Sequence, residues 1–566
     1  MPGNYVVHLS ASNFLPGQPL ARHTSLTGHG TSANTDDGLD ENGIDAANPS
    51  ITGISSPPVL LFAGNAPTAA NGETGAGSGT DDGNDANGDL TVDFGFVPGL
   101  PTSYAAWQLR FLPSGSNSPS QDADRDGQPN AYEYVYHLSP SGSTGAESPL
   151  GLRADPATGL ISATLVYNPG AADAPPVLTW RADLRDGTGI WQTMTSPVPT
   201  DVILPDGRRQ RTWSNLEAVP ALAGGTGFVR ATSSMDTNGD SMSDFTFHTP
   251  VLGWLDRLHH EGTATAATAF LRPALFRGTV DSASGPALTL TVSTGAGNLA
   301  SIFPPGVACY AEITGGSWEG HRFEIDETAT SGAMLRLLAA SPLHTRSVPD
   351  LTGVPLVVRP HWTLATLFPP AQFKADTDST RADQVLTYPR PSFATHWLLD
   401  LGANDRWVRA DDSSLSDAGH LPIPPGEGVF VNRRDPALTV LDMGEVRPHA
   451  MARLLNAGYT LQASGWPVPG TPVSCGLLAS DGFTGNTNPA QADGLQIWGA
   501  DTHGGAGAFR SYFLLRAAVP YRYWTEKSDA NLQDRNNEIL LMPSRAVFLQ
   551  LRAGIPDSRQ PRPWTP

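Results

Sequence analysis

Lysine and cysteine are almost absent from this 566-residue chain, and it has no long apolar runs. The only lysines are Lys374 and Lys527, so arginine carries nearly all the positive charge. Two distant cysteines, Cys309 and Cys475, leave a disulfide and two buried free thiols equally open. No stretch of about 18 apolar residues occurs, so no membrane-spanning helix is expected.

Positive charge is scarce overall, with 35 basic residues against 55 acidic ones and a net charge of −20. Such a balance repels phosphate backbones, which argues against nucleic acid as a partner. Divalent cations are the natural counterions instead. Asp is concentrated in loops that are also rich in Gly and Asn, so these loops are the places to look for cation sites.

The composition predicts a mostly β, multidomain fold. One hydrophobic core does not serve 566 residues, and the 59 Gly and 50 Pro suit short strands joined by tight turns. We expect a partial β-sandwich at residues 1–97, a short helical calcium linker at 101–150, a small β-sandwich at 151–250, a β-rich unit at 252–360, and internally repeated β units at 361–455 and 456–566.

The chain ends carry no export signal. The opening Met1-Pro2-Gly3-Asn4-Tyr5 lacks a basic region and an apolar region, so it does not resemble a signal peptide. The last residues show no anchor. If the protein is exported, we expect this chain to be an N-terminally truncated piece of an extracellular or cell-surface protein.

Residues 1–97 contain three strand-like runs, at 5–9, 58–62 and 90–96, separated by acidic loops at 36–45 and 81–85. Three strands do not close a sandwich, so a partner strand is missing or is supplied from elsewhere. The acidic loops fit no fixed ligand spacing, and a solvated turn is the simplest interpretation of each.

This segment resembles the C-terminal half of the B-type repeat of serine-aspartate-repeat surface adhesins. The resemblance is carried by the opening Asn4–Val7, the acidic loops and the closing Val92–Phe96. It implies a β-sandwich that calcium makes rigid and that serves as a spacer or stalk. The family's first strands and their calcium loop are absent here. The Lys–Asn crosslink of some related sandwiches is excluded, because no lysine precedes Lys374.

The clearest local motif spans residues 122–133, Asp-Ala-Asp-Arg-Asp-Gly-Gln-Pro-Asn-Ala-Tyr-Glu. Oxygen-bearing side chains fill loop positions 1, 3, 5, 9 and 12, with Gly127 at position 6, which is the spacing of an EF-hand-type calcium loop. The expected ligands are the side chains of Asp122, Asp124 and Asp126, the Gln128 carbonyl, Asn130 directly or through water, and a bidentate Glu133.

The same loop resembles the Asp-x-Asp-x-Asp-Gly calcium motifs of dockerins and thrombospondin type-3 repeats. The resemblance implies a structural calcium ion that holds a linker too short to build its own core. The alternative is a solvated acidic turn. A second, weaker calcium candidate consists of Asp236, Asn238, Asp240 and Asp244, where position 12 is the apolar Phe247.

Residues 252–566 contain an internal repeat of about a hundred residues. Runs at 383–388, 396–400, 406–408 and 428–431 are answered in the same order by runs at 493–498, 512–516, 523–525 and 546–549, and 362–364 matches 459–461. Two similar β units packed as a pseudo-symmetric pair are therefore expected. This part resembles an uncharacterised family of large exported bacterial proteins, and that resemblance implies no activity.

No enzymatic motif is visible: the chain has no Gly-x-Ser-x-Gly, no His-Glu-x-x-His and no phosphate loop. The adjacent His259 and His260 predict surface histidines rather than a metal site. Trp397, Trp407, Trp498 and Trp524 lie in alternating strand patterns, which favours core packing over a sugar-stacking platform.

The sequence therefore favours a non-enzymatic, calcium-stabilised stalk or adhesion protein outside a bacterial cell, with an unidentified protein or polysaccharide ligand. The alternative is a polysaccharide-binding or polysaccharide-degrading protein, with the C-terminal repeat as its carbohydrate unit.

Overall fold

The structure is a computed structural model, and it confirms a mostly β, multidomain fold. The chain divides into two compact units, one holding Met1–Ser103 with two short later segments and one holding nearly all of the rest. No helix among the described residues is long and apolar enough to cross a membrane. The described residues are 3–15, 18–20, 23–25, 43–44, 49–61, 94, 96–98, 100–112, 118–140, 148–185, 189–204, 206–236, 242–284, 289–292, 298–338, 351–389, 392–499, 508–516 and 522–564.

The first unit contains three two-stranded antiparallel ladders in its described part. Phe14 and Ile54 are buried, and the Phe14 ring meets the Phe96 ring edge to face at 5.9 Å. The acidic loops expected at 36–45 and 81–85 lie outside the described residues, apart from Gly43 and Ile44. The ladders pair β1 (Gly3–Tyr5) with β5 (Val59–Leu61), β2 (His8–Leu9) with β4 (Ile54–Ser55), and β3 (His23–Ser25) with β6 (Phe96–Pro98).

The second unit begins with two short helices, α2 (Tyr104–Phe111) and α3 (Asn130–Tyr136). Trp107 of α2 and Tyr134 of α3 are fully buried, with ring centroids 6.1 Å apart. The Tyr134 hydroxyl donates to Asp173 at 2.6 Å, which ties α3 to the β-structure that follows. The helical linker therefore shares a core with that β-structure instead of building its own.

Two sheets enclose this shared core. In one, β8 (Ile161–Tyr167) lies between β7 (Leu150–Ala154) and β12 (Arg209–Trp213). Strand β8 alternates buried and half-buried residues, as its sequence predicts. The other sheet has the order β10 (Gln192–Thr193), β9 (Val177–Arg181), β13 (Thr226–Met235), β15 (Leu252–His259) and β29 (Leu438–Glu445), with β14 (Phe245–His248) paired to β13.

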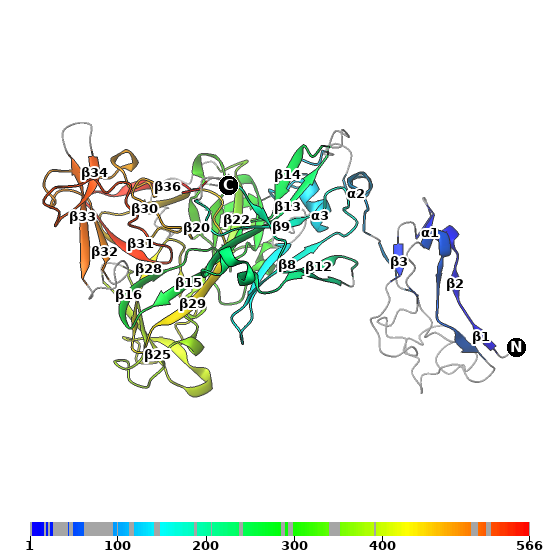
Figure 1. The fold of residues 1–566 in the computed structure, drawn as a ribbon, viewed down its shortest axis with the longest axis horizontal. Helices are drawn as coiled ribbons and strands as arrows, with labels where there is room; N and C mark the ends of the chain where they lie inside the picture. Colours follow the sequence, from blue (N-terminus) through cyan, green and yellow to red (C-terminus); the bar gives the residue numbers. More distant parts are fainter. Residues whose placement is uncertain are drawn as a thin grey trace. The chain divides into compact units, whose positions relative to one another are not determined.

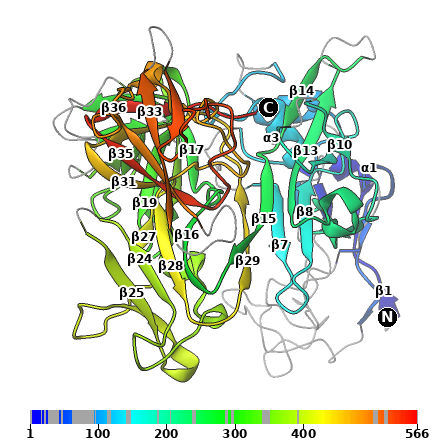
Figure 2. The ribbon, with the colours of Figure 1, turned by 60° about the vertical axis from the view of Figure 1, so that its left-hand side comes forward.

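The pairing of β13 with β15 crosses the boundary expected near residue 250. The long pairing of β15 with β29 joins the units expected at 252–360 and 361–455 (Figure 2). Leu252 to His259 pair with Glu445 to Leu438 without a break. A separate six-stranded sheet follows, in the order β20 (Arg322–Glu324), β19 (Cys309–Ile313), β22 (Pro355–Pro360), β17 (Phe276–Ser284), β18 (Thr289–Val292) and β21 (Met334–Arg336). Cys309 of this sheet and the distant Cys475 are both buried free thiols, so the disulfide alternative does not hold.

The internal repeat forms two five-stranded sheets of equivalent topology (Figures 1 and 2). The first has the order β16 (Gly262–Ala267), β28 (Gly428–Arg433), β24 (Gln384–Thr387), β25 (Ala394–Leu399) and β26 (Arg406–Arg409). The second has the order β31 (Gly458–Ala463), β35 (Ala546–Leu551), β32 (Gly494–Trp498), β33 (Phe509–Arg516) and β34 (Arg522–Glu526).

Equivalent hydrogen bonds support the repeat. Asp383, fully buried, accepts the backbone N–H groups of Lys374 at 2.9 Å and Arg434 at 2.6 Å. Asp493 accepts those of Thr484 and Arg552, both at 2.7 Å. The two carboxylates therefore play the same structural part in the two units.

One repeat correspondence is wrong. In the first sheet, β16 occupies the edge position that β31 occupies in the second sheet. Trp362 and Thr363, which were expected there, form β23 (Trp362–Thr363) and pair with β27 (Pro422–Ile423). A strand from residues 262–267 thus completes the unit expected at 361–455. Similarly, β30 (Met451–Leu455) pairs with β36 (Ile555–Gln560), near the end of the chain.

The two repeat sheets meet through aromatic side chains. Trp498 and Phe509, on paired strands, have ring centroids 4.8 Å apart, and Trp498 lies 5.9 Å from Phe430 of the first sheet. Core packing is confirmed for Trp397, Trp407 and Trp524, which are buried, whereas Trp498 is half-buried at this joint. We call the following set the aromatic joint: Tyr388, Phe393, Phe430, Tyr459, Trp498, Phe509 and Phe548.

The expectation of surface histidines is wrong for His259, which is fully buried. Its ring packs edge to face on Phe368 at 6.0 Å and on Phe373 at 5.8 Å. At this end of β15 the exposed Asp256 and Leu258 alternate with the buried Arg257 and His259, so the period of a strand, not that of a helix, directs the His259 side chain inward.

Candidate metal site

The loop of residues 122–133 lies between α2 and α3, where the sequence predicts it. Pro129 stands at the N-cap of α3, and its carbonyl accepts the N–H groups of Tyr132 and Glu133. Glu133 therefore lies on the first turn of α3. This placement fixes the direction of the Glu133 carboxylate relative to the loop.

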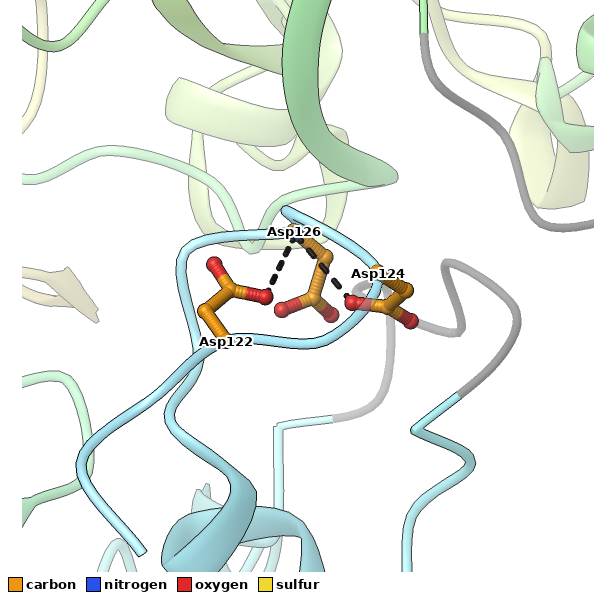
Figure 3. A group of neighbouring side chains, drawn as sticks. All are labelled: Asp122, Asp124 and Asp126. Carbon is orange, nitrogen blue, oxygen red and sulfur yellow. Dashed lines mark hydrogen bonds between the residues drawn. The ribbon is translucent and has the colours of Figure 1, made fainter. Parts of the chain in front are cut away.

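The three aspartates gather their carboxylates in the loop (Figure 3). One carboxylate oxygen from each of Asp122, Asp124 and Asp126 lies within 4.8 Å of the others. Asp122 accepts the N–H groups of Arg125 at 2.7 Å, Asp126 at 3.2 Å and Gly127 at 2.8 Å, which winds the backbone around its own side chain. The turn needs Gly127, whose φ of +89° is in the left-handed region.

Glu133 is the most unusual member of the site. Its side chain is 1 % exposed, and within the described part of the chain neither carboxylate oxygen has a hydrogen-bond partner. Burial, followed by the charges of Asp124, Asp126 and Asp122, raises the pKa of Glu133 to about 10. Burying a charged group costs folding free energy unless the group is paired or binds a metal, so a cation bound here would stabilise this carboxylate.

The aspartates carry the same electrostatic cost. Burial, then the charge of Asp122, raises the pKa of Asp124 to about 6, and burial, then the charge of Asp124, raises the pKa of Asp126 to about 7. Each raised pKa reports burial first and then repulsion among the neighbouring carboxylates. A bound divalent cation would reverse it, because it favours the charged form of every ligand.

Asn130, expected to act directly or through water, makes two hydrogen bonds within the loop segment. Its Oδ1 accepts the Ala123 N–H at 3.2 Å, and its Nδ2 donates to the Ser118 carbonyl at 3.0 Å. The buried amide thus braces the two ends of the loop against each other. In many loops of this type the residue at position 9 coordinates the ion through a water molecule, and Asn130 would act in that way here.

The donor set fits calcium better than other common metals. All the candidate ligands are oxygens: three aspartates, the Gln128 carbonyl and a buried Glu133 able to bind through two oxygens. Calcium takes six to eight such ligands in flexible geometry, whereas magnesium demands a near-ideal octahedron with several waters. Zinc prefers nitrogen and sulfur ligands, which this loop does not offer.

The loop also touches the six-stranded sheet. The Thr279 hydroxyl of β17 donates to the Arg125 carbonyl at 3.0 Å, and the Arg125 guanidinium lies 4.0 Å from Asp281. Arg277, on the same strand, lowers the pKa of Asp126, in opposition to burial and the acids. The loop therefore links the helix-and-sandwich core to the next sheet.

The second candidate site lies partly outside the described residues. Asn238 and Asp240 lie outside the described residues, while Asp236 and the exposed Asp244 flank the β13–β14 hairpin. Phe247, at the twelfth position, is buried in the core, so that position supplies no ligand. Among the described residues, the only cluster of three or more metal-ligating groups is the one at Asp122, Asp124 and Asp126.

The sequence predicts the candidate ligands but not their surroundings. Neither the burial of Glu133 nor the nearness of Arg277 has a local signal, because both arise from strands that are distant in sequence. Comparisons add no family: no family model, no curated protein and no solved structure matches the chain.

Proposed function

We propose that the chain is a non-enzymatic, calcium-stabilised stalk or adhesion element of a bacterial surface protein. The observation that carries the proposal is the buried Glu133 carboxylate, which lacks a hydrogen-bond partner beside three converging aspartates. Calcium at this site would be structural, because the loop is anchored in the core shared by α2, α3 and the sandwich and also contacts the separate six-stranded sheet.

Calcium would act here as a clamp between two cores. On one side, Glu133 belongs to α3, whose Tyr134 is buried against α2 and the sandwich. On the other side, the Arg125 carbonyl accepts from Thr279 of β17. Ordering the loop therefore stiffens the connection between the sandwich and the six-stranded sheet, which is what a spacer requires. Loops of this type outside cells bind with dissociation constants of about 10⁻⁴–10⁻³ M, which suits extracellular calcium.

Hydrogen–deuterium exchange tests this proposal on the whole chain. In chelator, repulsion among the acids should let the loop open, so the amides of Arg125, Asp126 and Gly127 should exchange quickly. With calcium at about 5 mM, we expect exchange across residues 121–133 to slow by about tenfold or more.

The turn at Asp155 is the matched control. Asp155 accepts the Ala157 and Thr158 N–H groups at 2.9 and 2.8 Å, an arrangement like that of the loop but with a single carboxylate. Its exchange should not depend on calcium. Equal exchange of residues 121–133 with and without calcium would contradict the proposal.

The polysaccharide alternative rests on the aromatic joint. Phe393, Tyr459 and Phe509 remain 42 %, 40 % and 39 % exposed, although their neighbours are buried. Exposed aromatic faces suit sugar rings. Binding to a glycan array or turnover of an insoluble polysaccharide would favour this alternative, whereas calcium-dependent stiffening without any ligand would favour the stalk.

A further inference from the structure

A cavity of about 290 Å³ lies beside the calcium loop, within the second unit. One wall is formed by Gly127–Pro129 and Tyr132, and the others come from the sandwich, from β17, from the segment after β29 and from the C-terminal tail. Five parts of the chain that are far apart in sequence thus converge on it. Its volume is at the lower end of the range for small-molecule sites, enough for one ring-sized ligand.

Arginine dominates the lining. The cavity is lined by Arg230, Arg277, Arg447 and Arg562, and the one acid among the lining residues is Glu445. This concentration of positive charge occurs in a chain of net charge −20. Since the protein as a whole repels anions, a local cluster of guanidinium groups marks a place where an anion is favoured.

Two of the arginines are already neutralised. Arg277 lies 3.3 Å from Glu445, and Arg447 pairs with Glu312. Glu445 also pairs with Arg359, so its charge is shared between two guanidinium groups. These residues hold the framework of the cavity together and leave little negative charge for the other two arginines.

Arg230 and Arg562 make no ion pair with any described carboxylate. The Arg230 guanidinium lies over the Trp191 ring at 4.3 Å, and burial, followed by the charge of Arg181, lowers its pKa to about 10. Arg562 donates to the carbonyls of Trp564, at 3.0 Å, and Pro448, at 2.6 Å, and burial lowers its pKa against the opposing charge of Glu319. Both groups keep N–H donors and positive charge for a ligand.

Two tryptophans give the cavity flat apolar faces. Trp191 and Trp564 are both half-buried and both line it. Trp564 is held in place by the fully buried Trp466, whose ring meets it edge to face at 5.1 Å. Guanidinium groups beside aromatic faces suit a ligand that carries an anionic group on a compact ring.

We propose that this cavity binds a carboxylated sugar ring, either free or at the end of an acidic polysaccharide. The carboxylate would lie between Arg230 and Arg562, and the ring would pack on Trp191 and Trp564. The four residues that would contact the ligand lie outside the calcium loop, although the loop forms one wall of the cavity.

Calorimetric titration of the whole chain in calcium tests the proposal. The probes are glucuronate, galacturonate and mannuronate, with glucose as the neutral control and sulfate as the bare anion. At least one uronate should bind with a dissociation constant of millimolar or tighter, and glucose should not bind. An oligouronide of the uronate that binds distinguishes the sources: tighter binding than the monomer indicates a polysaccharide end, and equal binding indicates a free sugar.

Arg230→Met and Arg562→Met should each weaken uronate binding by tenfold or more. Arg211→Met is the control, since its guanidinium pairs with Asp201 at 2.7 Å outside the cavity. If Arg230→Met fails to fold, Arg562→Met still tests the proposal, because Arg562 lies in the tail after β36 and not in a sheet. Absence of binding by all three uronates, binding unaffected by both variants, or equal binding of sulfate and uronate would overturn the proposal. The same titration in chelator distinguishes this proposal from the calcium proposal. Uronate binding that persists in chelator would support the uronate site even if the loop bound no calcium.

Discussion

Glu133→Gln should raise the melting temperature of the second unit in chelator and lower it relative to the unaltered protein in calcium. The pKa of Glu133 is about 10 in the folded protein, against 4.5 for a free carboxyl group. For an acid this shift favours folding fully only below pH 4.5, and the contribution is lost as the pH rises toward 10. At pH 7 the burial of Glu133 thus costs free energy that a glutamine does not.

The expected gain in chelator is about 1–3 kcal/mol, or a few degrees, at pH 7. With calcium at about 5 mM the order should reverse, because the variant loses the bidentate ligand while the unaltered protein gains about 2 kcal/mol. Asp155→Asn changes a turn with a single carboxylate, so its melting temperature should differ from that of the unaltered protein by the same amount in chelator and in calcium. A variant that melts lower in chelator and in calcium by the same amount would show that Glu133 is an ordinary structural partner and not a metal ligand.

Glu445→Gln should destabilise the second unit by about 3–5 kcal/mol at pH 7, because it leaves buried arginines without their counter-charge. Glu445 is the last residue of β29 and is 3 % exposed. Arg359, almost fully buried, donates to both of its oxygens, and Arg277 lies 3.3 Å away. Glu526→Gln is the matched control, since Glu526 pairs with Arg510 near the surface and should cost about 1 kcal/mol or less.

Acid should erase the difference between Glu445→Gln and the unaltered protein. Burial alone would raise the pKa of Glu445, but Arg359 and Arg277 outweigh it and lower the pKa to about 2. The stabilisation is therefore present above pH 4.5 and is lost as the pH falls toward 2. The difference between the two melting temperatures should narrow as the pH falls from 7 to 3 and vanish toward pH 2. Parallel curves would contradict this assignment of the ion pair.

The local patterns in the sequence were sufficient to predict strands, helices and the cluster of acidic side chains at residues 122–126. The alternation in Ile161–Tyr167 gave β8, and the spacing from Asp122 to Glu133 placed an acidic loop before a helix. Each of these features depends on residues a few positions apart, where periodicity and turn chemistry act directly.

Features that depend on distant strands could not be predicted. The sequence gives no sign that β16 replaces residues 362–364 in the first repeat sheet, because edge pairing depends on which strand is nearby after folding. The burial of Glu133 and of Glu445 likewise follows from packing. The arginine-lined cavity draws its walls from five separate segments and has no motif at all.

Calorimetric titration of calcium into the whole chain tests the central claim most directly, with Glu133→Gln and Asp155→Asn titrated alongside. We expect binding with a dissociation constant of about 10⁻³ M or tighter. Glu133→Gln should weaken this binding by a hundredfold or more, and Asp155→Asn should leave it unchanged. No heat of binding in the unaltered protein, or equal binding in all three, would contradict a calcium site at residues 122–133.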